Sequence, residues 1–280
     1  MRNISAQAIT DAVARLCIEA NTRLPQDVQA ALDKARQEEP WPLAKNTLDL
    51  LWSNLSAARE KDLPICQDTG MAVVFIDLGQ ECHITGGALE DAVNAGVAAG
   101  YTEGYLRKSM VSDPLRRVNT EDNTPAVLHL RLVPGDQMSI TVAPKGAGSE
   151  NMTTLKMLKP TTPLEEVENA IIQAVEDAGS NPCPPVVVGI GIGGNSEQCT
   201  LLAKRALLRP LDAHNPDPLY REMEERLLER INKLGIGPQG LGGTVTALAV
   251  SILPAATHIA QLPICVNLCC HVCRHASAFL

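Results

Sequence analysis

Aromatic residues are scarce in this chain of 280 residues, where Phe, Trp and Tyr together make up 2% of the sequence. Proteins that bind single-stranded nucleic acid stack the bases on aromatic side chains, so the shortage argues against that class. Basic residues are outnumbered as well, with 24 Lys and Arg against 32 Asp and Glu and a formal net charge of -8. Because nucleic-acid affinity comes from clustered Lys and Arg, we expect no nucleic-acid partner.

No segment is a candidate for crossing a membrane. A transmembrane helix needs about 18 or more consecutive apolar residues, and the two closest segments, 183–194 and 243–256, are interrupted by Gly, Pro and polar residues. The first twenty residues carry charged and polar side chains where a secretory leader would have an apolar core. We therefore expect a cytoplasmic protein with no membrane contact.

Cysteine is abundant by comparison, with nine residues in an otherwise ordinary globular composition of 45% hydrophobic and 20% charged residues. Cytosolic thiols are kept reduced, and they bind metals or act in catalysis more often than they form disulfides. The one clear basic patch is small and suits a small anionic ligand; it consists of Arg107, Lys108, Arg116 and Arg117.

Hydrophobic periodicity predicts helices over residues 5–20, 25–36 and 45–60, so the first sixty residues should be helical. Further helices are predicted at 87–100, 163–178, 196–207 and 217–234, and strands at 71–79, 126–134, 138–144 and within 184–194. Gly135 and Asp136 between two of these strands suit a hairpin. Because helices and strands alternate irregularly, we predict an α+β fold, with a mixed β-sheet packed with helices, in a single domain over residues 1–280.

The segment PICQDTG at 64–70 is the first candidate site. It places a thiol, an amide and a carboxylate, those of Cys66, Gln67 and Asp68, at one bend before a buried strand. Binding groups collect in such loops when a rigid scaffold supports them. The alternative is a buried structural cysteine beside an aspartate that caps the turn.

Two glycine-rich segments are candidates for ligand-binding loops. KGAGSEN at 145–151 would offer backbone N–H groups and a lysine to an anion; it lacks the order of a Walker loop, and a flexible turn is the alternative. GIGIGG at 189–194 lacks the spacing of a dinucleotide fingerprint, so we reject NAD binding. Cys183, held between two prolines, is a better candidate ligand than Cys199, which falls in a predicted helix.

The C-terminal segment concentrates thiols at Cys265, Cys269, Cys270 and Cys273. Thiolates select soft or borderline metals, so a zinc or iron-sulfur site made by this segment alone is one interpretation. The paired CxxC spacing of zinc ribbons is absent, however. His258, which precedes LPICVNLCC, is typical of a core or surface histidine unless the fold brings it to a substrate.

Six segments that occur in one order resemble a known family. PICQDTG, KGAGSENMT, NPCPPVVVGIGIGG, RPL at 209–211, LGIGPQGLGG at 234–243 and RHA at 274–276 are similar to the alpha subunit, or N-terminal domain, of the class I iron-sulfur fumarate hydratases, which include the L-tartrate dehydratases. The resemblance spans nearly the whole chain. It implies a hydro-lyase that reversibly hydrates fumarate to malate. Dehydration of L-tartrate or a related hydroxydicarboxylate is the alternative, and a non-catalytic zinc or iron-sulfur protein is the alternative from another class.

The resemblance also implies a 4Fe-4S cluster with one iron open to substrate. Its ligands would be Cys66, Cys183 and Cys270, the last because the family's cysteine stands eight residues after the Leu of LP, here Leu262. Matching positions imply roles for six more residues: Asp68 and His258 as catalytic groups, and Gln67, Arg107, Gly146 and Gly148 as substrate-binding groups. Asp68 would bond the leaving hydroxyl or water, and His258 would help to hold the substrate carboxylate.

The family's C-terminal domain, which carries a catalytic threonine base, has no match in this sequence. We therefore expect a separate beta subunit to complete the enzyme, with an α2β2 assembly and a small dicarboxylate as substrate.

Overall fold

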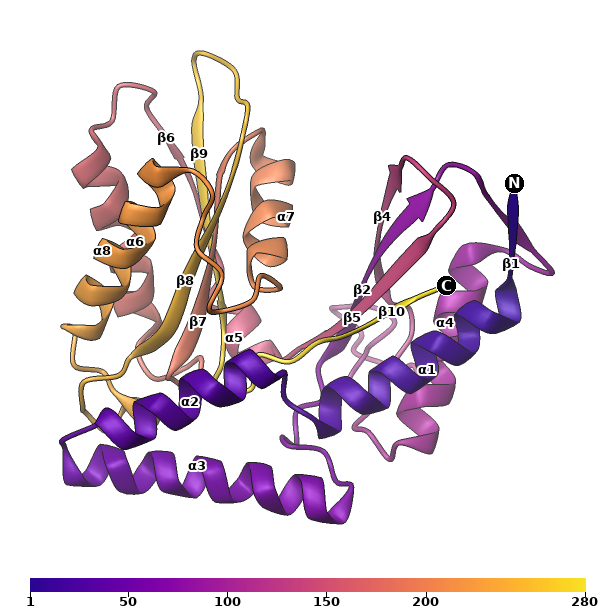
Figure 1. The fold of residues 1–280 in the computed structure, drawn as a ribbon, viewed down its shortest axis with the longest axis horizontal. Helices are drawn as coiled ribbons and strands as arrows, with labels where there is room; N and C mark the ends of the chain where they lie inside the picture. Colours follow the sequence, from indigo (N-terminus) through magenta and orange to yellow (C-terminus); the bar gives the residue numbers. More distant parts are fainter. The chain divides into compact units, whose positions relative to one another are not determined.

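The computed structural model describes residues 1–280, which form two compact units that interleave along the chain (Figure 1). The first unit consists of Met1–Pro25, Leu55–Ala147 and Arg274–Leu280, and the second of Gln26–Asn54 and Gly148–Cys273. The chain therefore leaves the first unit twice and returns to it twice. That residues 1–280 act as a single hydro-lyase domain stays a prediction.

A four-stranded mixed sheet in the order β10-β5-β2-β4 forms the centre of the first unit. Its strands are β2 (Met71–Gly79), β4 (Val127–Val133), β5 (Met138–Lys145) and β10 (Ala276–Phe279). β2 pairs parallel with β4 and antiparallel with β5, while β10 pairs antiparallel with β5. A separate parallel pair joins β1 (Arg2–Ser5) to β3 (Cys82–Thr85).

The predicted hairpin between the strands at 126–134 and 138–144 is wrong, although both strands exist. β2 lies between β4 and β5, so these two strands are not paired with each other. β2 is buried without interruption from residue 72 to 76, whereas β4 is exposed at Leu130 and Leu132. A strand that is apolar on both faces gains most from a central position, and this gain outweighs the short connection between β4 and β5.

Helices α1 (Ala6–Thr22) and α4 (Leu89–Glu103) close the core of the first unit. The hydroxyl of Ser5 accepts a hydrogen bond from the Ala8 backbone N–H at 3.1 Å, which caps the start of α1. Apolar residues recur along α1 at helical spacing, and Ile9, Val13 and Leu16 are fully buried. They pack in one core with Val74 and Ile76 of β2 and with Val93 and Val97 of α4.

The second unit is built on another four-stranded mixed sheet, in the order β6-β9-β7-β8. Its strands are β6 (Thr154–Leu158), β7 (Val186–Gly193), β8 (Ala247–Ala255) and β9 (Leu262–Cys269). Strands β7 and β8 are parallel, and β9 is antiparallel to both β6 and β7. Helices α6 (Leu164–Ala178) and α8 (Pro218–Asn232) cover one face, and α7 (Ser196–Ala206) covers the other (Figure 1).

The structure confirms the α+β fold and the helical predictions over 5–20, 25–36 and 45–60. These correspond to α1, α2 (Gln26–Glu38) and α3 (Pro42–Lys61), with the short strand β1 before them. The later helices predicted near 87–100, 163–178, 196–207 and 217–234 are also present. A short helix α5 (Ala147–Glu150) lies within the KGAGSEN segment, and a 3-10 turn follows Gly237.

The glycines of the GIGIGG segment serve helix packing. Along β7, Val188 and Ile190 point into the core formed with α6 and α8, while Gly189 and Gly191 alternate with them and face α7. A Cβ atom at position 189 would lie 2.3 Å from the carbonyl oxygen of Ala203 in α7. The absence of side chains thus lets α7 approach the sheet closely.

Alanine at position 191 is expected to lower the free energy of unfolding by about 1–3 kcal/mol, the usual cost of overpacking. The added Cβ would lie 2.1 Å from the Cys199 carbonyl oxygen, a backbone atom that cannot rotate away. Urea denaturation followed by circular dichroism measures the loss. Gly87→Ala is the control, because its Cβ would approach no atom closer than 3.2 Å; an equal loss in both variants would contradict the packing role.

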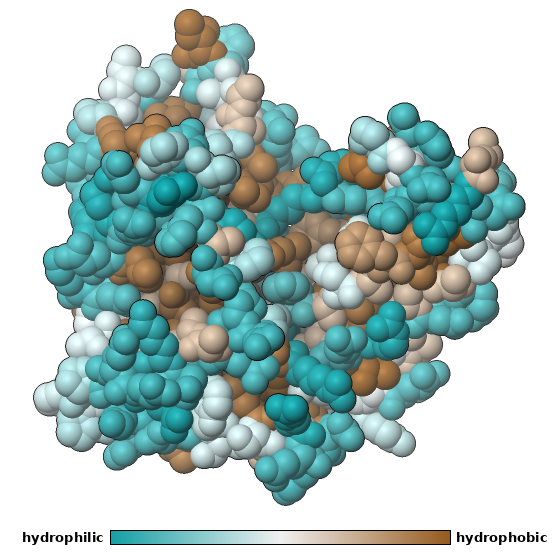
Figure 2. Space-filling model, viewed as in Figure 1, coloured by the Kyte–Doolittle hydropathy of each residue, from teal (hydrophilic) through white to brown (hydrophobic).

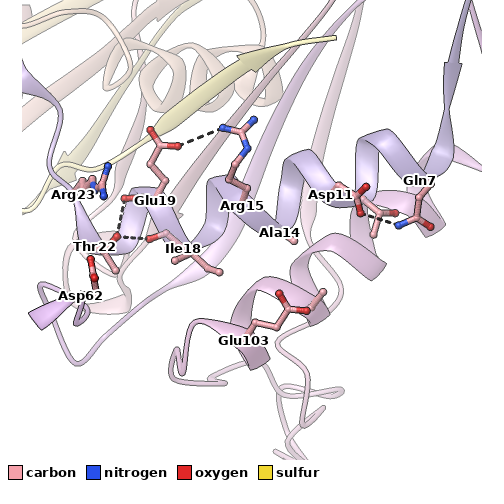
Figure 3. Close-up of a pocket in the computed structure, with 12 residues that line it drawn as sticks. Gln7, Asp11, Ala14, Arg15, Ile18, Glu19, Thr22, Arg23, Asp62 and Glu103 are labelled. Atoms are coloured by element: carbon pink, nitrogen blue, oxygen red, sulfur yellow. Dashed lines mark hydrogen bonds and ion pairs between the residues drawn. The ribbon is translucent and has the colours of Figure 1, made fainter. Parts of the chain in front are cut away.

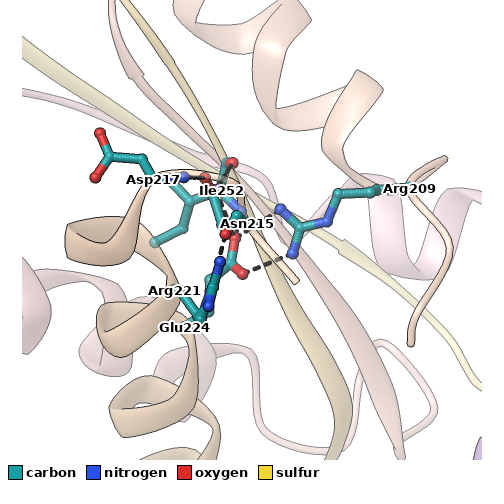
Figure 4. A network of polar contacts seen from close by, with 6 residues as sticks. All are labelled: Arg209, Asn215, Asp217, Arg221, Glu224 and Ile252. Atoms are coloured by element: carbon teal, nitrogen blue, oxygen red, sulfur yellow. Dashed lines mark hydrogen bonds and ion pairs between the residues drawn. The ribbon is translucent and has the colours of Figure 1, made fainter. Parts of the chain in front are cut away.

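A buried carboxylate organises the RPL segment at 209–211 (Figure 4). Glu224 of α8 is 6% exposed, and its two oxygens accept hydrogen bonds from Nη1 and Nη2 of Arg209, each at 2.7 Å. One of the same oxygens accepts from the Ile252 backbone N–H at 2.7 Å and from Asn215 Nδ2 at 3.1 Å. This network joins α8, the segment after α7 and strand β8, so RPL has a structural role in the second unit.

Hydrophilic residues predominate on the face drawn in Figure 2, and hydrophobic residues form separated patches between them. Scattered exposed apolar residues of this kind are ordinary for globular proteins. None of the helices combines the length and the apolar character that crossing a membrane requires.

Candidate functional site

Burial divides the nine cysteines into two groups. None forms a disulfide, and five are buried: Cys17, Cys199, Cys265, Cys269 and Cys273. Burial raises the pKa of the Cys17 and Cys265 thiols to about 12 and that of Cys199 to about 11. A thiol with such a pKa is protonated at neutral pH, and a protonated thiol is a poor metal ligand. The cysteines outside the buried group are Cys66, Cys82, Cys183 and Cys270.

The three predicted cluster ligands all belong to this accessible group. Cys66 lies in the first unit, whereas Cys183 and Cys270 lie in the second. Within either unit, no three Cys, His, Asp or Glu side chains converge in a way that could hold a metal ion. A zinc or iron-sulfur site made by the C-terminal cysteines alone is therefore not formed in this structure.

In the first unit, Asp68 joins the PICQDTG bend to the glycine loop. Its Oδ1 accepts a hydrogen bond from the Gly70 backbone N–H at 2.9 Å, which is the turn-capping contact considered as the alternative role. Its Oδ2 accepts from the Ala147 backbone N–H at 2.9 Å, across 79 residues of sequence. The second contact places Gly146 next to the Asp68 carboxylate, so the structure brings two of the predicted site segments together.

Arg107 is anchored to the same bend. The hydroxyl of Thr69 donates to the Arg107 carbonyl at 3.0 Å, and the buried hydroxyl of Tyr101 donates to the Thr69 carbonyl at 2.7 Å. The side chains of Gln67 and Arg107 are both exposed. The first unit thus holds Cys66, Gln67, Asp68 and Arg107 on one connected network, with an amide, a carboxylate and a cation accessible to a ligand.

Arg274, quoted only as part of the RHA segment, is a member of this network that the sequence interpretation missed. It is 5% exposed, and its Nη2 donates to the Asp68 carbonyl oxygen. Its Nε and Nη1 have no hydrogen-bond partner in the protein. A buried guanidinium is costly without partners, and it adds a positive charge beside Asp68. The only sequence signal was that this arginine directly follows Cys273.

In the second unit, Cys183 and Cys270 lie at the same end of the sheet. Cys269, the last residue of β9, pairs with Val187 near the start of β7, and Cys183 stands just before that start. The backbone N–H of His271 donates to the Cys183 carbonyl at 3.4 Å, and the His271 Nδ1 lies 3.1 Å from the same oxygen. His271, the residue after Cys270, is therefore in direct contact with the backbone of Cys183.

The structure places Gly148 near this end of the second unit and His258 at the other. A Cβ at position 148 would lie 3.3 Å from the carbonyl oxygen of Asn181, two residues before Cys183. His258 follows β8, whose last residue, Ala255, pairs with Gly193 at the far end of β7. Eight strand residues span about 26 Å. The structure thus does not bring His258 to Cys183, and its catalytic role stays a prediction.

A groove of about 800 Å³ lies along α1 and the end of α4 in the first unit (Figure 3). It contains none of the predicted site residues. Its polar side chains are partly engaged with each other, since Arg15 Nη1 lies 3.6 Å from Glu19 Oε2 and Gln7 Nε2 donates to Asp11 Oδ1 at 2.8 Å. The groove and the PICQDTG network are thus separate features of this unit.

Comparison with known proteins covers almost all of the chain. Residues 10–279 match the family described as fumarate hydratase (Fumerase). A protein of Methanocaldococcus jannaschii named "Putative L(+)-tartrate dehydratase subunit alpha" is 40% identical over 274 residues, covering 96% of both chains. The L(+)-tartrate dehydratase subunit alpha of Escherichia coli K12 and that of Shigella sonnei are each 31% identical over 273 residues, covering 96% of this chain and 89% of theirs.

The family match and the extent of these similarities agree with the six segments singled out in the sequence. Asp68 of PICQDTG contacts the glycine loop in the first unit, and Cys183 of NPCPP meets His271 at one end of the second sheet, whereas RPL lies in the Glu224 network. Hydro-lyase chemistry, the addition or removal of water, is what this family performs. The chain belongs to the fumarate hydratase family of hydro-lyases.

Proposed function

We propose that this protein is the alpha subunit of an iron-sulfur hydro-lyase that reversibly hydrates fumarate to malate. The observation that carries the proposal is that Cys66, Cys183 and Cys270 are three of the four cysteines outside the buried group, in a chain whose family is fumarate hydratase. L-tartrate is the second candidate substrate, because the similar proteins are named for tartrate dehydratase. Their names also include "subunit alpha", which supports a separate beta subunit; the α2β2 assembly is part of the proposal.

The donor set fits a 4Fe-4S cluster held by three thiolates, Cys66, Cys183 and Cys270. These three thiols are accessible to a metal, whereas burial raises the pKa of Cys17, Cys199 and Cys265 and so opposes the loss of their protons. When bound, such a cluster supplies an iron without a protein ligand, which acts as a Lewis acid toward a hydroxyl and a carboxylate.

The protein's own groups would bind and orient the diacid. Arg107 is exposed on an anchored loop and can pair with one substrate carboxylate, and backbone N–H groups at Gly146 and Gly148 can donate to a carboxylate. Gln67 offers an exposed amide beside them. Asp68 can accept a further hydrogen bond from a hydroxyl or a water, because a carboxylate has more acceptor positions than its two backbone contacts use.

Purification of the complete complex from its native host under anaerobic conditions tests the proposal. Fumarate, L-malate and L-tartrate are supplied separately, and consumption or formation of the double bond is followed by absorbance. We expect turnover of fumarate and L-malate; preferred turnover of L-tartrate would replace the substrate assignment. A complex that contains iron and sulfide but turns over none of the three acids, nor a methylated hydroxydicarboxylate, would overturn the hydro-lyase proposal in favour of an iron-sulfur carrier.

Asp68→Asn is expected to lower kcat about 100-fold or more, the lower end of what a general acid-base group contributes. Asparagine keeps the shape and the Oδ1 contact to Gly70, but it presents an NH2 group toward the Ala147 N–H and cannot exchange a proton. Steady-state kinetics of the complex measures kcat and KM separately. Asp113→Asn is the matched control, because Asp113 also caps a turn through the N–H groups of Leu115 and Arg116; equal losses would argue against catalysis by Asp68.

A further inference from the structure

Gln239 occupies an unusual backbone position in the LGIGPQGLGG segment. Its φ is +55°, in the left-handed region that favours glycine, and its neighbours Gly237 and Gly240 are also left-handed. Glycine is abundant in this segment, yet position 239 carries a long side chain. Strained residues of this kind persist where surrounding contacts fix them, and they cluster at functional sites.

Two hydrogen bonds hold Gln239 to the same oxygen. Its backbone N–H donates to the Pro184 carbonyl at 2.8 Å, and its side-chain Nε2 donates to that carbonyl at 2.9 Å. A carbonyl oxygen has two lone pairs and can accept both. Gln239 therefore binds Pro184, the residue that follows Cys183, through two hydrogen bonds. The φ of Cys183 is +55°, which is also in the left-handed region.

The same amide reaches the second cysteine segment. Nε2 of Gln239 lies 3.3 Å from Nδ1 of His271, which follows Cys270. The His271 backbone N–H in turn donates to the Cys183 carbonyl at 3.4 Å. Gln239, the Cys183–Pro184 pair and His271 thus form a closed set of contacts, all within the second unit.

From these contacts we infer that Gln239 is a positioning residue that holds the thiols of Cys183 and Cys270 at a common site before any metal binds. The inference deepens the proposed function, on which it rests, by adding a residue that orients two of the ligands. Groups that orient ligands in this way typically change metal affinity about 10–100-fold when they are removed. Gln239 itself supplies no ligand atom, so its removal should appear as a weaker ability of the Cys183 and Cys270 thiols to bind one atom together.

Phenylarsine oxide tests the pairing directly, because its trivalent arsenic binds tightly only where two thiols can reach it together. The full cluster-free chain is titrated anaerobically with this probe, and peptide mapping identifies the bridged cysteines. The wild-type chain is expected to bind through Cys183 and Cys270. Gln239→Gly, which suits the left-handed backbone and removes the amide, is expected to weaken this binding about tenfold or more.

Gln239→Glu is the second variant, since it keeps the side-chain stem and the backbone hydrogen bond to Pro184 but removes the amide donor. The same loss of arsenical affinity is expected. Gln173→Ala is the matched control, because that glutamine makes only an exposed contact with Asp177 at 2.8 Å. Unchanged arsenical affinity in either Gln239 variant, with the fold verified by circular dichroism, would overturn the positioning role.

Iron and sulfide analysis separates this inference from the proposed function. In chains reconstituted anaerobically, Cys183→Ser and Cys270→Ser should lose iron, and Gln239→Gly should release iron to a chelator faster than wild type. Unchanged iron content in both cysteine variants would overturn the proposed ligand set even if the arsenical pairing depends on Gln239. Loss of iron in the cysteine variants with unaltered release from Gln239→Gly would overturn only the role of Gln239.

Discussion

Serine in place of Cys66, Cys183 or Cys270 is expected to abolish turnover by the complete complex and to remove most of its iron. A hydroxyl is a far weaker ligand than a thiolate for iron-sulfur clusters, and even loss of a residue that only orients a ligand costs about 10–100-fold. We therefore expect activity to fall by more than about 100-fold in each single variant. Iron and sulfide analysis with EPR spectroscopy, performed beside the kinetic assay, measures the effect on the cluster itself.

The other cysteines provide the controls for this experiment. Cys82→Ser is the matched variant, because Cys82 is half-buried like Cys66 and belongs to the same unit. Cys269→Ser tests the residue next to Cys270, and we expect iron content near wild type because Cys269 is 6% exposed. If Cys269→Ser lost iron while Cys270→Ser retained it, the third ligand would have been assigned to the wrong cysteine.

Glu224→Leu is expected to lower the free energy of unfolding by about 3–5 kcal/mol, the typical cost of removing one partner of a buried ion pair. The substitution would leave the Arg209 guanidinium, whose side chain is 17% exposed, without its bidentate partner. It would also remove the acceptor for the Ile252 backbone N–H. Urea denaturation of the chain measures the loss, with the midpoint and the slope fitted separately.

Two further variants show whether the cost comes from the stranded charge. Glu222→Leu changes a neighbouring glutamate of α8 that is 68% exposed, and its effect should be small. The double variant Arg209→Met with Glu224→Leu should recover much of the stability, because an apolar pair often replaces a buried ion pair without loss. A single Glu224→Leu variant as stable as Glu222→Leu would contradict the structural role of the network.

The helices could be predicted well from the sequence because periodicity is a local property. α1, α6 and α8 place their apolar residues on one face, and that pattern alone indicated their positions. Strand pairing was harder to predict than the helices. β5 pairs with β2 because β2 is buried on both faces, and that burial depends on the rest of the fold. The division into two interleaved units was also beyond local patterns, because segments far apart in the sequence, such as β5 and β10, belong to one sheet.

The site could be predicted only as a set of motifs. Cys66 and Asp68 stood out because several reactive side chain types share one bend, and the resemblance to a family assigned their roles. Asp68 contacts Ala147, which is 79 positions away in the sequence, and Arg274, which is 206 positions away. Gln239 makes contacts of the same kind. Such contacts depend on the folded backbone, so no spacing rule could have revealed them.

The enclosure of five thiols also determines how this protein should age in air. Oxidants attack exposed thiolates, converting them first to sulfenic acids and then to species that cannot be reduced. Cys17, Cys199 and Cys265 are shielded and remain protonated, so the damage should collect on the accessible cysteines. Ageing would then impair the chemistry while the scaffold stays intact, and a mild reductant would restore the protein only if applied early.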